Sequence, residues 1–321
     1  MSMLICAVIA LIIDRIIGWP ERLFQRISHP VVAIGHLISW CDKTFNKTDG
    51  SSSIRRISGI ITVIIVAGVC LLVALIISHF IPEGVFGIIL TSLLIWPWIA
   101  AKSLSDHVIK VAVALAASDV NAARNAVSMI VGRNAKTLDN FGIARASLES
   151  LAENTSDGVV APLFWTVIFG LPGLFVYKAI NTMDSMIGYR TQNYEAFGWA
   201  AAKLDDLANF LPARLTGLLF ALTATKPIYS MSIMWRDAGK HRSPNAGWPE
   251  AGFAAALNIQ LSGPRDYEGT RSNDKWLHEE GRNPTEKDIV LGLKHYNRLL
   301  NWLIVVAFAL LVLFWLNKAG Y

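Results

Sequence analysis

The chain has 321 residues, of which 53% are hydrophobic and only 17% charged, and its mean hydropathy is +0.43. Soluble globular proteins carry about 25% charged residues, so this composition argues against an ordinary soluble domain and predicts a membrane protein. The net charge of +5 comes from basic residues that lie between the apolar runs, which favours a positive cytoplasmic face over a nucleic-acid-binding surface.

The first hundred residues predict a short helix and then a transmembrane hairpin. Residues 3–17 form an apolar helix, and residues 18–56 are polar and basic. Residues 57–81 and 85–101 are each apolar and about long enough to span a bilayer, with a turn between them. We therefore predict a transmembrane hairpin over 57–101.

The middle and the end of the chain alternate between polar and apolar stretches. Residues 102–157 have a helical pattern without a strand signal, and Asp119 is placed to cap a helix. Residues 226–300 form the longest polar segment, which we predict to be a cytoplasmic loop region containing a helix from Pro284. Residues 301–317 predict a C-terminal span.

The apolar run 158–180 contains the sequence GLPG at its centre, which predicts a re-entrant hairpin and not a crossing. Irregular backbone is tolerated at membrane depth where protein surrounds it. A full crossing would separate the polar residues on the two sides of this run, whereas a hairpin keeps them on one face. We therefore predict an all-α, polytopic integral membrane protein with about four to six membrane segments and helical cytoplasmic segments, forming a single membrane-embedded domain over 1–321.

Acidic and amide side chains concentrate in 145–214, which we predict to be the catalytic core. They recur at helical spacing beside apolar sequence, where carboxylates are costly to bury without a cation. Mg²⁺ bound together with a phosphate suits such oxygen ligands. The predicted metal ligands are Glu149, Glu153, Asp157, Asp184, Asp205 and Asp206, and all of these except Asp157 are also predicted catalytic residues.

Cations and polar side chains near this core are candidates for substrate binding, because Arg and Lys pair with phosphate and carboxamides form hydrogen bonds. The predicted set is His29, Arg133, Asn154, Ser156, Asn181, Ser185, Lys203, Asn209, Arg214, Ser243, Asn245 and Glu250. The alternatives are structural: a turn at His29, an ion pair of Asp184 with Lys178, a salt bridge from the Asp205 pair to Lys203, and a plain surface loop around Ser243.

Several long motifs together resemble the CobD/CbiB family of cobalamin biosynthesis, the adenosylcobinamide-phosphate synthases. They are HPVVAIG at 29–35, VGRNAKTLD at 131–139, ESLAENTSDGVVAPLFW at 149–165, YKAINTMDSMIGYR at 177–190, FGWAAAKLDDLANFLPARLTG at 197–217 and SPNAGWPEAG at 243–252. The family pattern favours Asp after Gly-Arg, where this chain has Asn134.

The resemblance implies a ligase that joins adenosylcobyric acid to (R)-1-aminopropan-2-ol O-phosphate, with ATP as co-substrate and Mg²⁺. It implies a multi-pass protein of the cell inner membrane, in contact with lipid, with its active site facing the cytoplasm and small molecules, not nucleic acid, as ligands. Other late cobalamin-assembly membrane enzymes and a second copy of the chain are further expected partners. The sequence contains no GxxxxGK[ST], so the expected ATP site is not a P-loop.

Three other readings remain open from the residues themselves. Intramembrane Asn and Asp beside a broken helix also suit a transporter or a corrinoid-binding scaffold, although no repeated half is visible. A Mg²⁺-dependent prenyl-diphosphate transferase would also place acidic motifs on membrane helices. A relative without catalytic activity is the third.

Overall fold

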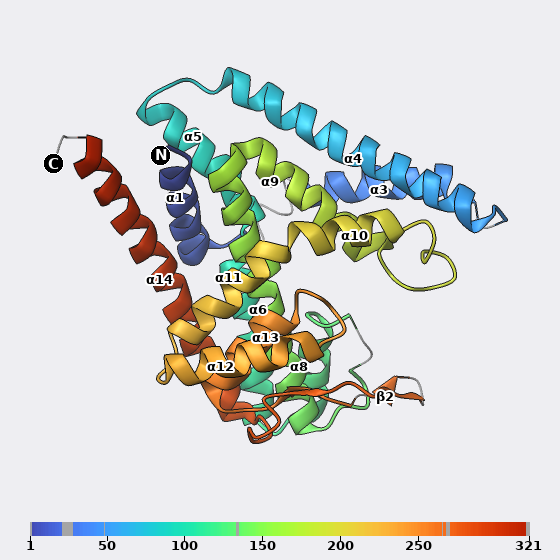
Figure 1. Cartoon of the computed structure of the whole chain (residues 1–321), viewed down its shortest axis with the longest axis vertical. Helices are drawn as coiled ribbons and strands as arrows, with labels where there is room; N and C mark the ends of the chain where they lie inside the picture. Colours follow the sequence, from blue (N-terminus) through green and yellow to red (C-terminus); the bar gives the residue numbers. More distant parts are fainter. Residues whose placement is uncertain are drawn as a thin grey trace. The chain divides into compact units, whose positions relative to one another are not determined.

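The computed structural model describes residues 2–20, 28–47, 49–132, 135–264, 266–267 and 270–318, and helices form nearly all of its regular structure (Figure 1). The chain divides into two compact units, of which the first comprises residues 1–100 and 161–209 and the second comprises residues 101–160 and 210–321. The all-α prediction is confirmed. The prediction of one membrane-embedded domain stays a prediction.

The first unit is built around α4 and α9. Its elements are α1 (Ser2–Ile17), α3 (Pro30–Phe45), α4 (Ser52–Phe80), α5 (Val85–Ile95), the 3₁₀ turn η1 (Trp96–Trp98), α9 (Ala161–Ile187) and α10 (Trp199–Ala208). Ser51 begins α4 by accepting a hydrogen bond from the Ile54 amide at 3.4 Å. In Figure 1, α3 runs beside α4, and α4 also packs against α9. The predicted span at 57–81, apart from its last residue, therefore lies within one long helix.

The helix α9 reverses direction at Gly170, as the GLPG sequence predicts. Gly170 has φ 67°, a left-handed conformation that favours glycine. Gly173 packs so closely beneath the first arm that an added Cβ would lie 2.5 Å from the Trp165 carbonyl oxygen. As a result, Ala161 and Tyr177 share one buried cluster, whereas a straight helix would place them about 24 Å apart. The predicted bend is confirmed.

The second unit contains the remaining helices and the strands. Its elements are α6 (Ala101–Ala116), α7 (Val120–Ser128), α8 (Asn140–Thr155), the π-helical turn η2 (Ser156–Val160), α11 (Phe210–Leu222), α12 (Pro227–Asp237), the 3₁₀ turn η3 (Ala238–Lys240), α13 (Gly247–Leu257), β1 (Leu261–Ser262), β2 (Asp266–Tyr267), β3 (Thr270–Arg271), β4 (Trp276–Leu277) and α14 (Glu286–Lys318). Asp119 caps α7 as predicted, by accepting from the Ala122 amide at 2.9 Å. The antiparallel pairs are β1 with β4 and β2 with β3.

Two boundaries differ from the sequence prediction. The helix predicted from Pro284 and the span predicted from residue 301 form one continuous helix, α14, because no proline or glycine interrupts its backbone near residue 300. The polar segment 226–300 is not mainly loop, since α12, α13 and the start of α14 occupy much of it.

Four helical stretches in the described residues are long and apolar enough to cross a membrane: Ser52–Phe80, Val85–Ala116, Asn140–Ile187 and Glu286–Asn317. Only 28% of the most apolar window in Ser52–Phe80 is buried, so most of that surface is available to lipid. Within the stretch Val85–Ala116, α5 ends at Ile95, the 3₁₀ turn occupies Trp96–Trp98, and Ile99 is extended before α6 begins at Ala101. The prediction of a polytopic membrane protein is confirmed.

Candidate functional site

A hydrogen-bonded polar network surrounds Asp205 in the first unit. Asn209 donates from its Nδ2 to Asp205 Oδ2 at 3.0 Å, and Asn181 donates from its Nδ2 to Asp205 Oδ1 at 3.4 Å. Lys178 Nζ in turn donates to Asn181 Oδ1 at 3.5 Å. Because Asn181 and Asp205 are predicted site residues from separate motifs, the fold brings α9 and α10 together at one carboxylate.

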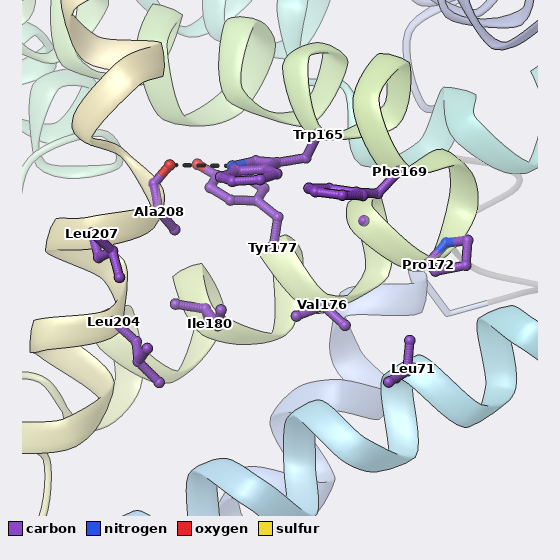
Figure 2. Close-up of a pocket in the computed structure, with 11 residues that line it drawn as sticks. Leu71, Trp165, Phe169, Pro172, Val176, Tyr177, Ile180, Leu204, Leu207 and Ala208 are labelled. Carbon is purple, nitrogen blue, oxygen red and sulfur yellow. Dashed lines mark hydrogen bonds between the residues drawn. The ribbon is translucent and has the colours of Figure 1, made fainter.

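Tyr177, which is not among the residues predicted from the sequence, also belongs to the network. The Tyr177 hydroxyl donates to Asn209 Oδ1 at 3.0 Å, and both side chains are almost fully buried. Trp165, on the other arm of α9, donates from its indole Nε1 to the Ala208 carbonyl oxygen at 3.1 Å (Figure 2). Two aromatic side chains thus fix the end of α10. The sequence feature that could have identified Tyr177 is its position in the same motif as Asn181 and Asp184.

The protein environment makes the charged form of Asp205 costly. Burial raises the pKa of the Asp205 carboxyl, and the neighbouring Asp206 charge adds to this effect, while the amides of Asn209 and Asn181 and the Lys178 ammonium oppose it. Asp206 itself lies 3.6 Å from Lys203 Nζ on the more exposed side of α10. The salt bridge with Lys203 that the sequence suggested as an alternative therefore forms with Asp206, whereas Asp205 accepts hydrogen bonds from side-chain amides.

Asp184 and Ser185 lie one turn further along α9 than Asn181. The Ser185 hydroxyl donates to the Asn181 carbonyl oxygen at 2.9 Å and its side chain is exposed, while Asp184 is half-buried. Asp184 lies against the chain where α9 ends: a Cβ added at Gly188 would lie 2.1 Å from Asp184 Oδ1. Their predicted roles stay predictions.

Both ring nitrogens of His29 are engaged by the backbone. Nδ1 accepts from the Val31 amide at 3.2 Å and caps α3, so the ring proton lies on Nε2, 2.7 Å from the Pro97 carbonyl oxygen. Burial lowers the pKa of His29, which keeps the imidazole neutral. This geometry matches the structural turn, and a role in substrate binding stays a prediction.

In the second unit, Arg214 is held between two aromatic rings. Its guanidinium carbon lies 3.5 Å from the Phe210 ring centroid and 4.6 Å from that of Trp248, while Nη1 donates to the Phe210 carbonyl oxygen at 2.7 Å and to Asn245 Oδ1 at 3.4 Å. Close packing of α11 on α13, through Gly217 and Gly252, sets this spacing, because an added Cβ at Gly252 would lie 2.5 Å from the Gly217 carbonyl oxygen. A guanidinium fixed in this way is preorganised to bind an anion.

The loop before α13 places a histidine beside a buried carboxylate. The Ser243 amide donates to His241 Nδ1 at 3.0 Å, so the ring proton lies on Nε2, which is 3.6 Å from Glu250 Oε1. The Ser243 hydroxyl accepts from the amides of Asn245 and Ala246, each at 3.2 Å. Ser243 therefore shapes the loop, and Glu250, which is 2% exposed, gains a partner that sequence reasoning missed.

The three carboxylates of α8 and η2 lie in different environments. Glu149 is buried and its Oε1 accepts from the Ser262 amide of β1 at 2.7 Å, whereas Glu153 is exposed. Asp157 lies in the π-helical turn that directly follows α8, and it is half-buried. Glu149 and Glu153 therefore differ in burial, and the role of all three carboxylates as metal ligands stays a prediction.

The polar groups near these carboxylates are also resolved. Asn154 donates to the Ser150 carbonyl oxygen at 2.9 Å, within its own helix. The Ser156 hydroxyl is buried in the π-helical turn, and no hydrogen-bond partner for it is present among the described residues. Because π-helical turns often occur at functional sites, Ser156 remains a substrate-binding candidate. Arg133 and Asn134 lie outside the described residues.

No group of three or more His, Cys, Asp and Glu side chains that could hold a metal ion occurs in the described part of the chain. The predicted residues instead form separate clusters, around Asp205 in the first unit and around Arg214 and Glu250 in the second. Binding of one cation by all six predicted carboxylates stays a prediction. Asp205 lies in the amide network, and Asp206 is next to it in sequence and acts on it electrostatically.

Comparison with known proteins decides the family. The model of the family described as CobD/Cbib protein matches residues 7–296, a range that contains every predicted site residue. The chain belongs to the CobD/CbiB family. Cobalamin biosynthesis protein CobD of Rhodobacter capsulatus is 49% identical over 299 residues, covering 93% of this chain and 94% of the relative. The protein of the same name from Brucella suis is 48% identical over 298 residues, covering 90% and 91%. No solved structure gives a significant match.

Membership of the CobD/CbiB family confirms the resemblance that the motifs indicate. Tyr177 and Lys178 are the first residues of the YKAINTMDSMIGYR motif, and Trp248 lies within SPNAGWPEAG. The polar network around Asp205 and the aromatic contacts of Arg214 are therefore both made by motif residues. His241 lies two residues before the SPNAGWPEAG motif, so the motif residues alone do not indicate it.

Proposed function

We propose that the chain joins adenosylcobyric acid to (R)-1-aminopropan-2-ol O-phosphate, giving adenosylcobinamide phosphate, with consumption of ATP. Membership of the CobD/CbiB family supports a place in cobalamin biosynthesis, because the relatives carry that process in their names. The observation that carries the proposal is the amide network that holds Asp205 at the meeting of two family motifs. Such a network fixes a carboxylate in one orientation, as a reaction centre requires.

The proposed reaction has two steps, because a carboxylate does not condense with an amine without activation. An oxygen of the corrinoid carboxylate bonds to the γ-phosphorus of ATP, and the bond to ADP breaks, which leaves an acyl phosphate. The neutral amine then attacks the acyl carbon, the bond from that carbon to the phosphate oxygen breaks, and inorganic phosphate leaves. The amine loses one proton before attack and one after it, so a base must lie close by.

The residues around Asp205 fit Mg²⁺ bound jointly with a substrate. Mg²⁺ prefers oxygen ligands and is commonly held by one or two carboxylates together with substrate phosphates, so Asp205, with or without Asp206, would supply the protein's part of such a site. When bound, Mg²⁺ would neutralise phosphate charge during phosphoryl transfer. Burial makes the Asp205 carboxylate costly as an isolated anion, and a cation would offset that cost. Asp184, Glu149, Glu153 and Asp157 complete the predicted ligand set.

The anionic parts of the substrates require fixed cations, and Arg214 is the best-prepared one. Its guanidinium is stacked between Phe210 and Trp248 and oriented by Asn245, so it can bind a phosphate or carboxylate with little loss of side-chain entropy. Glu250 beside His241 is placed in the same unit as a group that could accept a proton. We assign the site to the cytoplasmic face of the inner membrane, where the basic segments favour it.

The test is a direct assay with the purified full-length chain. Adenosylcobyric acid, the aminopropanol phosphate, ATP and Mg²⁺ are supplied, and the products are followed by mass spectrometry. Formation of the amide together with ADP and phosphate, and its loss on chelation of Mg²⁺, is the expected result. Corrinoid binding without amide formation would reject the proposal and favour a scaffold, whereas turnover of a prenyl diphosphate would favour the rival enzyme. Association with other membrane enzymes of late cobalamin assembly, or with a second copy, is a separate prediction.

A further inference from the structure

An apolar cavity of about 460 Å³ lies within the first unit, between α4, the two arms of α9 and α10 (Figure 2). Leu71 of α4 forms one wall, Val176 and Ile180 line the second arm of α9, and Leu204 and Leu207 belong to α10. The volume falls within the range of about 300–1,000 Å³ that is usual for small-molecule pockets. None of the residues in the polar network around Asp205 except Tyr177 lines it, so it is distinct from that network.

Both side-chain donors in the cavity wall are already engaged by the protein. The side-chain polar groups of the residues that line it are the Trp165 indole and the Tyr177 hydroxyl, and these donate to the Ala208 carbonyl oxygen and to Asn209 Oδ1, respectively. A polar ligand would lose its hydration here without replacement, whereas a hydrocarbon would gain from burial. The chemistry of the cavity therefore selects an alkyl chain.

The rim of the cavity carries exposed apolar side chains. Leu71 lies in Ser52–Phe80, a candidate membrane span, and it is followed by Leu72, which is 58% exposed. Phe169 and Leu207, which also line the cavity, are 60% and 70% exposed. An opening bordered by exposed apolar side chains, with a candidate membrane span as one wall, would be accessible from the hydrocarbon of a bilayer.

The two ends of the cavity differ in polarity. Figure 2 shows Leu204, Leu207 and Ala208 at one end and Leu71 and Pro172 at the other. The α10 end is next in sequence to the ion pair of Lys203 with Asp206, whereas Leu71 lies in the candidate span that has the highest hydropathy of the four in the described residues. We propose that this cavity binds one acyl chain of a membrane phospholipid, with its headgroup end at α10 and its methyl end towards Leu71.

A bound chain would support the hairpin of α9. Trp165 and Tyr177, on its two arms, face the cavity and also fix the end of α10 through Ala208 and Asn209. An occupied cavity would hold these rings against α10, so lipid should raise the unfolding temperature of the detergent-solubilised chain. This effect does not depend on the proposed enzymatic reaction.

The test uses tryptophan quenching by brominated lipid. The full-length chain, depleted of lipid in detergent, is titrated with phosphatidylcholine that carries bromine in its acyl chains. We expect a saturable quenching component that Trp165→Phe removes and that unbrominated phosphatidylcholine competes away. Native mass spectrometry should show one retained phospholipid on the wild-type chain.

Two double variants provide the matched comparison. Leu71→Phe with Val176→Phe fills the cavity, and Val69→Phe with Leu72→Phe adds the same volume on the exposed face of α4. The filled variant should bind the brominated lipid at least about tenfold more weakly, and the control should match the wild type. Circular dichroism and size-exclusion chromatography establish that both are folded.

Three results would overturn the proposal. The first is quenching of the wild-type chain that never saturates, which indicates bulk partitioning only. The second is loss of a dimer in the filled variant with unchanged lipid binding, which would indicate that a second copy covers the cavity. The third is a saturable quenching signal that is unchanged in Trp165→Phe. If the filled variant does not fold, the competition experiment on the wild type and the Trp165→Phe comparison decide alone.

Discussion

Asp205→Asn is the substitution that best separates a reaction centre from a structural polar cluster. The change keeps the shape of the side chain and removes its charge. Asp205 accepts from Asn209 at 3.0 Å and from Asn181 at 3.4 Å, and Asn181 is itself oriented by Lys178. An asparagine at position 205 has only one acceptor oxygen, so it can keep the shorter of these bonds and must lose the other.

The expected effect on stability is small because two terms oppose each other. Loss of one hydrogen bond costs about 0.5–1.5 kcal/mol. The substitution also removes the free-energy cost of keeping a charged carboxylate buried beside Asp206, which is the reason its pKa is raised, and this gain opposes the loss of the hydrogen bond. We expect the free energy of unfolding to change by less than about 1 kcal/mol, which corresponds to a shift of about 2–4 °C or less in melting temperature.

The effect on activity should be large. If Asp205 helps to hold Mg²⁺ with a substrate phosphate, amide formation should fall by at least about a hundredfold, the size usual for the loss of one preorganised electrostatic group. Thermal unfolding in detergent and product mass spectrometry are the two measurements. Asp206→Asn removes a more exposed ion pair with Lys203 and should change stability by about 0–1 kcal/mol; because Asp206 is itself a proposed Mg²⁺ ligand, this variant is a comparison for stability and not for activity.

The pH dependence gives an independent check. The folded state raises the pKa of Asp205, so it favours the protonated form, and the resulting stability is present at low pH and lost as the pH rises through the folded-state pKa. Cation binding needs the ionised form, so Mg²⁺ affinity should rise with pH over the same interval, and Asp205→Asn should abolish both dependences. A large loss of melting temperature with retained activity would refute the reasoning and make Asp205 structural.

The remaining predictions concern the anchor of this network and the second unit. Tyr177→Phe should lower the free energy of unfolding by about 1–3 kcal/mol, because it leaves the buried Asn209 oxygen without its donor; thermal unfolding identical to the wild type would contradict this. Arg214→Lys should raise KM by about tenfold with the fold intact, because a lysine cannot stack on Trp248 or present a planar fork; an unchanged KM would remove Arg214 from the site. Asp237 is fully buried and, although burial raises its pKa, hydrogen bonds and charges from its neighbours outweigh this and lower that pKa to about 2. Asp237→Ala should therefore cost about 3–5 kcal/mol in denaturant titrations at neutral pH, and wild-type stability should fall as the pH drops from about 4 towards 2.

Hydropathy and glycine chemistry made much of the fold predictable. The span within α4, the cap at Asp119 and the reversal at Gly170 each follow from local sequence, because length, a capping carboxylate and a glycine in the left-handed region act over a few residues. The break predicted before residue 301 is absent because a change from polar to apolar composition does not by itself end a helix.

The site was less predictable because its decisive contacts are long-range or depend on helix type. The bond from Tyr177 to Asn209 joins residues of different motifs, and the partner of Glu250 is a histidine from a preceding loop. Asp157 lies in a π-helical turn, for which a pattern of residues spaced by four gives no signal. Sequence patterns therefore located the polar clusters but not the atoms that orient them.

The reversal at Gly170 has a consequence for topology mapping. The arm from Ala161 to Phe169 rises by about 14 Å, roughly half of a hydrocarbon core of about 30 Å. A hydropathy count that scores 158–180 as one passage changes the parity of the chain, so it assigns every later residue to the opposite compartment. Reporter fusions placed after Ile187 and at Lys318 should therefore both report the compartment opposite to the one that such a count assigns.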